Sequence, residues 1–113
     1  MPRPPLRLRR RAEFLRAASA GRRLPGTTLI LQALPRGDAG PVRVGFTVTR
    51  KVGNAVVRNR ARRRLREAAR LVLAETPVAG CDLVLVGREA TRRRDFSALQ
   101  DDLRAALRKA GVT

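Results

Sequence analysis

The sequence of 113 residues contains no histidine, tryptophan or tyrosine, and its only cysteine is Cys81. Zinc sites need several cysteine or histidine ligands, so this composition argues against most metal sites. It also excludes a disulfide framework and removes histidine, the commonest general base. One unpaired cysteine suits a reducing compartment, and we therefore expect a cytoplasmic protein.

Acidic residues are also scarce, because nine Asp and Glu stand against 26 Lys and Arg, which gives a net charge of +17. Such an excess of positive charge indicates a polyanionic partner, and phosphate chains bind basic surfaces by releasing counterions. The scattered acids argue against a protein-only nuclease, which needs a metal-binding carboxylate cluster. No GxSxG motif or phosphate loop is present. We expect no catalytic residue and no metal site in this chain.

Long apolar runs are missing as well. No segment approaches the roughly 18 apolar residues of a membrane span, so we expect no membrane partner. The start, MPRPPLRLRRR, is arginine-rich like a transit peptide, but its three prolines would interrupt an amphipathic helix. We expect a single RNA-binding domain over residues 1–113, with residues 1–10 as a flexible basic arm.

The apolar periodicity predicts three helices and three strands. The helices are expected over residues 12–21, from 55 to just before Pro77, and over 95–111, and the strands over 28–34, 42–49 and 81–87. The first helix should place Phe14, Leu15 and Ala18 on one side. The first two strands look like an antiparallel pair, and residues 81–87, apolar on both faces, should form a central strand. This order predicts an α+β sandwich with helices packed on a small sheet.

The most informative stretch is AVVRNRARRRLREAAR, residues 55–70, in which Glu67 is the only acid. Solvated helices usually mix both signs of charge to gain i,i+4 pairs. Here Arg58, Arg62, Arg66 and Arg70 follow one another at that spacing and are expected to repel. The predicted apolar stripe would pack on the domain and consists of Val57, Ala61, Leu65, Ala68, Ala69 and Val72. The arginines around it can hold phosphates bidentately, which favours nucleic-acid binding over a merely solvated face.

The start of this helix adds to that interpretation. Asn54 is a good N-cap, and the free N–H groups of a helix start favour phosphate. Arg50 and Lys51 bring charge to the same corner. Asn59, between Arg58 and Arg60, can bind a base edge or a 2′-hydroxyl, or can be an ordinary exposed polar residue.

Aromatic residues are limited to three phenylalanines. Phe46 and Phe96 lie on apolar stripes and are expected in the core. Phe14 lies on a short helix and could instead face a groove, where aromatic rings often stack on bases.

The segment VGFTVTRKVGNAVVRNRARRRLREAAR, residues 44–70, closely resembles the protein family of bacterial ribonuclease P. The family pattern is a strand ending in basic residues, then Val-Gly-Asn-Ala-Val, Arg-Asn-Arg and a basic run with Leu-Arg-Glu. Weaker similarity covers AEFLRAASAGRR, DLVLVGREAT and the last helix. The resemblance implies an accessory protein subunit of an endoribonuclease, with a catalytic RNA subunit and precursor tRNA as partners and no obligate protein partner. The RNA, with Mg²⁺, would cleave the precursor to give the mature 5′ end.

The family also implies a fold and a set of contacts. The fold would be a two-layer α/β sandwich of three helices and about four mostly antiparallel strands, the fourth near residues 21–25, with a left-handed βαβ crossover. A cleft between the central helix and the sheet would bind the 5′ leader through Phe14, Gln32 and Thr47. The residues expected to contact RNA are Arg50, Lys51, Asn54, Arg58, Asn59, Arg60, Arg62, Arg63 and Arg66.

Two departures from the family pattern affect the leader cleft. Many relatives have aromatic residues where Ala18 and Gln32 stand, so stacking on leader bases should be weaker here. A structural RNA binder of the ribosomal type would share the charge of this chain, but it would not prefer a precursor tRNA with a 5′ leader.

Overall fold

The computed structural model describes residues 5–113, and it confirms the three predicted helices and adds two strands to the three read from periodicity. The helices are α1 (Arg11–Ala20), α2 (Ala55–Glu75) and α3 (Phe96–Lys109). The strands are β1 (Leu6–Arg7), β2 (Arg22–Leu24), β3 (Leu29–Pro35), β4 (Arg43–Val48) and β5 (Cys81–Gly87). Two short 3-10 helices are also present: η1 (Arg50–Val52) directly precedes α2, and η2 (Glu89–Arg92) lies between β5 and α3.

The strands form one mixed sheet in the order β1-β4-β5-β3-β2. The fourth strand expected near residues 21–25 is β2, antiparallel to β3. The predicted antiparallel pairing of the segments that became β3 and β4 is wrong, because β5 lies between them, antiparallel to β3 and parallel to β4. Since β4, α2 and β5 form a parallel crossover, the sheet is mixed rather than mostly antiparallel. The left hand of this crossover stays a prediction.

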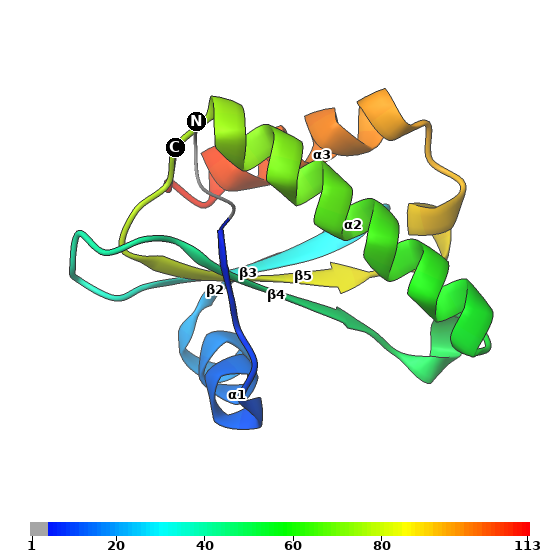
Figure 1. The fold of residues 1–113 in the computed structure, drawn as a ribbon, viewed down its shortest axis with the longest axis horizontal. Coiled ribbons are helices and arrows are strands. Elements are labelled where there is room, and N and C mark those ends of the chain that lie inside the picture. Colours follow the sequence, from blue (N-terminus) through cyan, green and yellow to red (C-terminus); the bar gives the residue numbers. More distant parts are fainter. Residues whose placement is uncertain (1–4) are drawn as a thin grey trace.

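The helices lie on both faces of the sheet, with α2 and α3 on one side and α1 on the other (Figure 1). The main core lies under α2 and α3 and includes Leu31, Leu65, Leu85 and Leu103. A smaller cluster on the α1 side is built on Leu8, Ala17 and Val84. The expected two-layer sandwich therefore holds for α2 and α3, while α1 adds a partial third layer.

The apolar side predicted for α1 is partly wrong. Ala17 is fully buried and Phe14 half-buried, but Ala18 is exposed and Leu15 is 54% exposed. The helix is thus turned so that Phe14 and Ala17, one turn apart, face the sheet.

The basic N-terminal segment joins the sheet at Leu6. Leu6 and Arg7 pair in parallel with β4, and Leu8 is buried against the face that α1 covers. Residues 5–10 are therefore an edge strand and the entry to α1 rather than a free arm. The first four residues of the predicted arm lie outside the described part of the chain.

The start of α2 has the geometry that its residues predict. Gly53 has a φ of 156°, a conformation that favours glycine, and an added Cβ would come within 2.9 Å of the Val57 side chain. Asn54 Oδ1 then accepts a hydrogen bond from the Val57 N–H at 3.0 Å, as an N-cap does. The predicted stripe is buried from Ala61 to Val72, and Val57 is half-buried.

Candidate nucleic-acid interface

One face of α2 forms a polar groove of about 180 Å³, lined by Asn59, Arg62, Arg63 and Arg66. Positions separated by three, four and seven residues lie on one side of a helix, which is why these side chains converge. Asn59 Oδ1 accepts a hydrogen bond from Arg62 Nη1 at 2.8 Å, so it orients that guanidinium. The structure thus brings four of the predicted RNA-contacting residues together on one surface.

The predicted cations form neither an ion pair nor a hydrogen bond to a backbone carbonyl within the described residues, unlike Arg64 and Arg70, the other arginines of α2. Within residues 5–113, no ion pair involves Arg50, Lys51, Arg58, Arg60, Arg62, Arg63 or Arg66. Arg70, which was not predicted to bind RNA, pairs with Glu67 at 2.5 Å. Arg64 donates to the Arg92 carbonyl at 2.7 Å and to the Arg94 carbonyl. Among the cations of η1 and α2, those with neither an acid nor a backbone carbonyl partner therefore lie on the face that carries the groove and at the helix start.

The remaining predicted residues lie at the start of α2. Arg50 and Lys51 are exposed on η1, just before the helix, and Asn54 is its N-cap. The Nε atom of Arg58 is buried and has no hydrogen-bond partner within the described residues. This corner therefore joins exposed cations to the free N–H groups of the first turn, an arrangement that suits a phosphate.

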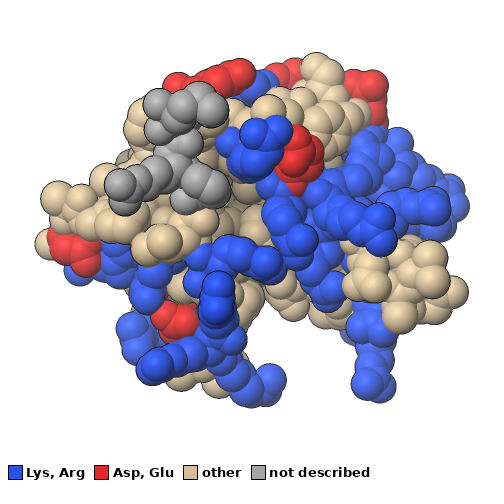
Figure 2. Space-filling model, in the orientation of Figure 1, with Lys and Arg blue, Asp and Glu red and all other residues tan. Residues whose placement is uncertain are grey.

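The charge is unevenly distributed over the surface (Figure 2). In this view Lys and Arg side chains spread over α2 and around α1, while Asp and Glu gather toward α3 at the top. A polyanion approaching this face meets more basic than acidic side chains, which raises association rates as well as affinity.

The three residues predicted for the leader cleft lie on the α1 face of the sheet. Phe14 packs over Gly45, since a Cβ at Gly45 would lie 2.6 Å from the Phe14 ring. Thr47 is two residues further along β4 and shares this face. Gln32 is paired with Val84, which is paired with Gly45, so it lies in the same row two strands away. The expectation that these three residues lie between the central helix and the sheet is therefore wrong, because α2 covers the opposite face, while the leader contact itself stays a prediction.

A buried ion-pair network that the sequence analysis missed fixes α1 to this face. Asp82 is 1% exposed and accepts from Arg43 Nε and Nη2 at 2.8 and 2.7 Å and from Arg36 Nη1 at 2.7 Å. Arg43 Nη1 donates at 2.7 Å to Glu13, the residue before Phe14. An aspartate inside an otherwise apolar strand could have signalled a buried charge that needs partners.

The pKa values of these carboxyl groups reflect their partners. Burial would raise the pKa of Asp82, but hydrogen bonds from Arg43 and Arg36 outweigh it and lower the pKa below its ordinary value. The pKa of Glu13 is lowered chiefly by the backbone N–H groups of Arg10 and Arg9, and also by Arg43. Both groups are therefore held as carboxylates at neutral pH.

Among residues 5–113, no three Asp, Glu, Cys or His side chains come close enough to hold a metal ion together. In the same part of the chain, no helix has the length and apolar character to cross a membrane.

Comparisons with known proteins agree with one another. The profile of the family described as Ribonuclease P matches residues 2–111. The ribonuclease P protein component of Gluconacetobacter diazotrophicus is 65% identical over 94% of this chain and 91% of its own length. The ribonuclease P protein component of Ruegeria pomeroyi is 56% identical over 90% of this chain and 83% of its own length. The solved ribonuclease P protein of Thermotoga maritima is 31% identical, with a TM-score of 0.77 over 91% of this chain and 96% of its own.

Proposed function

Because the chain belongs to the ribonuclease P protein family, we propose that it is the cytoplasmic protein subunit of an endoribonuclease that removes 5′ leaders from precursor tRNA. Its partners are a catalytic RNA subunit and the precursor tRNA, and the RNA performs the hydrolysis. The observation that carries this proposal is the set of uncompensated cations on α2, around the groove of Asn59, Arg62, Arg63 and Arg66.

The role of α2 follows from electrostatics. The catalytic RNA and its substrate are both polyanions and repel each other, so a basic surface between them lowers the free energy of their association. Arginine suits this task because its planar fork holds phosphates bidentately and stacks on unpaired bases. Asn59 and the free N–H groups at the start of α2 add hydrogen bonds that position the RNA backbone.

The α1 face is the proposed contact for the leader. Phe14 offers a half-buried ring supported by Gly45, and Thr47 and Gln32 offer polar groups on the same face. With an exposed Ala18 and a Gln32 where relatives carry aromatic rings, this surface holds the leader with one aromatic side chain.

The Mg²⁺ of the proposed reaction is assigned to the RNA subunit. The described residues bring together no set of carboxylates that fits such an ion. The protein's own contribution is to neutralise phosphates, so the complex should need less Mg²⁺ to assemble.

The test is precursor-tRNA cleavage at low Mg²⁺ by a bacterial ribonuclease P RNA, with and without the full chain. The wild type should restore 5′ processing, and the double variant Arg58→Ala, Arg62→Ala should restore it poorly. Arg104→Ala with Arg108→Ala removes the same charge from α3, where Arg104 is already paired with Glu75 and Asp101, and should behave like the wild type.

If the chain binds RNA but does not change the cleavage of precursor tRNA, the proposal is contradicted. A structural RNA binder of the ribosomal type would then be the better assignment, and it would bind precursor and mature tRNA equally.

A further inference from the structure

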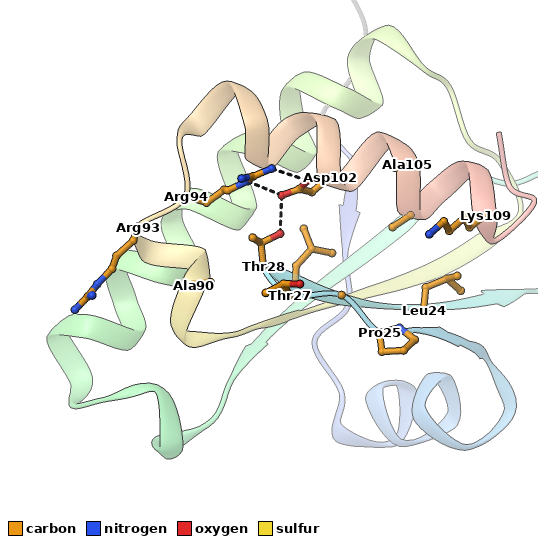
Figure 3. A pocket seen from close by; sticks show the side chains of 13 residues that line it. Leu24, Pro25, Thr27, Thr28, Ala90, Arg93, Arg94, Asp102, Ala105 and Lys109 are labelled. Carbon is orange, nitrogen blue, oxygen red and sulfur yellow. Dashed lines mark hydrogen bonds and ion pairs between the residues drawn. The ribbon is translucent and has the colours of Figure 1, made fainter.

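A second hollow, of about 590 Å³, opens between the β2–β3 turn and α3 on a part of the molecule that the proposed function does not use (Figure 3). Its walls come from the turn, from η2 and the segment after it, and from one stripe of α3. Its lining includes Leu24, Pro25, Thr27, Thr28, Arg93, Arg94, Asp102, Ala105 and Lys109.

The hollow exists because the α3 stripe that faces it carries small residues at its centre. Asp102, Ala105, Ala106 and Lys109 follow the three- and four-residue spacing of one helix side. The alanine side chains end at Cβ, so they leave space between the helix and the turn. Leu24 and Pro25 lie across that space and give it an apolar wall.

The single acid of the hollow is already neutralised. Asp102 Oδ2 accepts from Thr28 Oγ1 at 2.7 Å and from Arg94 Nε at 3.0 Å, and its Oδ1 accepts from Arg94 Nη2 at 3.3 Å (Figure 3). These bonds leave Asp102 little capacity to attract a cation. They also fix the β2–β3 turn against α3, so the walls are held in place.

The rim of the hollow carries an exposed cation at each of two ends. The Arg93 side chain is 75% exposed and forms only a long ion pair, of 3.9 Å, with the exposed Glu89. Lys109 is exposed and forms no ion pair within residues 5–113. Figure 3 shows Arg93 pointing outward at one end and Lys109 lying at the other. A ligand that fits both must carry negative charge at separate points.

The end of the hollow that carries Arg93 is joined to α2 by hydrogen bonds. Arg64 of α2 donates to the carbonyls of Arg92 and Arg94, and its guanidinium lies 5.9 Å from the centre of the Phe96 ring. The rim is thus held beside the helix that carries the candidate interface, and one RNA could contact both.

We propose that this hollow binds an unpaired nucleotide of an RNA. The base lies against Leu24, Pro25 and Ala105, the Thr27 hydroxyl hydrogen-bonds to it or to its ribose, and Arg93 and Lys109 contact the flanking phosphates. The volume falls in the range of small-ligand sites, and a nucleotide is the phosphate-bearing ligand that also needs an apolar wall. The inference takes from the proposed function only that the partner is RNA.

The test uses the full chain and pentaadenylate, with backbone amide shifts followed by NMR. Pentaadenylate should shift the amides of Thr27, Thr28 and Lys109 in a saturable way, separately from those of α2. Ala105→Leu fills the hollow with a good helix former, and it should weaken the affinity reported by these amides by about tenfold because base stacking is lost. The affinity for pentaadenylate that is measured from the amide shifts of α2 residues should stay the same.

The matched control is Ala74→Leu, the same change at an exposed position of α2 outside the hollow, and it should leave both affinities unaltered. The charge reversal Arg93→Glu, Lys109→Glu should also weaken binding at the hollow by about tenfold or more.

Three results would overturn the inference. In the first, pentaadenylate does not shift the amides around the hollow. In the second, the Ala105→Leu variant binds pentaadenylate at the hollow as tightly as the wild type does. In the third, inorganic phosphate alone reproduces the shifts in full. Because binding is read without the catalytic RNA, a failure of the precursor-cleavage test with these shifts retained would reject the proposed function and leave this site standing.

Discussion

The contact between Gly45 and Phe14 shows how one missing side chain shapes the α1 face. Any Cβ at position 45 would lie 2.6 Å from the ring and 3.1 Å from Leu8 Cβ. The ring is the movable end of its side chain, so a larger residue would push it off the sheet rather than unfold the domain. Its position over the strand therefore depends on glycine at this site.

Gly45→Ala should weaken binding of a precursor tRNA with a 5′ leader by about tenfold, the scale of one lost base–aromatic contact, and Phe14→Ala should do the same. Binding of mature tRNA, which lacks the leader, should not change for either variant. Equilibrium binding of the two RNAs to the assembled ribonucleoprotein measures this difference. Equal losses for both RNAs would mean that Phe14 has only a packing role.

The buried Asp82 carboxylate makes stability depend on pH. Its folded-state pKa lies below the ordinary 3.8 because of Arg43 and Arg36, despite its burial. The stabilisation is therefore complete above that ordinary value and is lost as the pH falls through the lower, folded-state pKa. The pKa values of Glu13 and Asp38 are lowered as well, so their contributions disappear in the same acid range.

Asp82→Asn should reduce the free energy of unfolding at pH 7 by about 3 kcal/mol, since it leaves two arginines without their shared acid. It should also flatten the loss of stability between about pH 5 and pH 2. Chemical denaturation at a series of pH values measures both. An unchanged acid slope in the variant would show that other groups dominate it.

At the scale of elements, the sequence predicts what local chemistry decides. The start of α2 is set by Gly53 and Asn54, and its buried stripe by spacing, and both agree with the structure. The pairing of β3 with β4 was predicted wrongly, because the strands are adjacent in sequence and only the long crossover through α2 inserts β5 between them.

The parts of the site that escaped prediction depend on contacts between distant residues. Arg43 and Asp82 are 39 residues apart, and their pairing is settled by the register of β4 on β5. The cleft residues were placed against the wrong helix because alternation gives the face that Thr47 shares but not which helix covers it. Leu6 and Arg7 were expected in a free arm, since only pairing with the edge of β4 makes them a strand.

Because Arg63 and Arg64 lie on different sides of α2, we expect their substitution by alanine to have opposite effects on stability and on RNA binding. Arg64 binds the carbonyls of Arg92 and Arg94, whereas Arg63 is exposed in the polar groove. Arg64→Ala should lower the free energy of unfolding by about 2 kcal/mol, because it removes hydrogen bonds from a charged group, and should alter RNA affinity little. Arg63→Ala should weaken RNA binding and leave stability nearly unchanged. Denaturation and RNA-binding curves on both variants measure the contrast, and a shared phenotype would contradict the division of the helix.

At the scale of the whole molecule, the charged side chains that give the net charge of +17 are unevenly distributed over the surface. The acids pair with arginines in the α1 network, on α2 and around α3, whereas the predicted cations of η1 and α2 form no ion pair within the described residues. Binding energy from such a surface comes largely from counterion release, so the salt dependence of affinity counts the phosphates that the protein contacts.

Each neutralised phosphate of single-stranded RNA should contribute about −0.7 to the slope of log K against log salt. Arg62→Ala with Arg66→Ala should therefore reduce the magnitude of the slope by about 1.4, or two contacts. Arg104→Ala with Arg108→Ala lowers the net charge equally but should leave the slope unchanged, because contacts and not total charge release counterions. Filter binding of the RNA subunit over a range of salt concentrations measures all three proteins. If both double variants lower the slope alike, binding follows net charge, and the groove on α2 is not the contact surface.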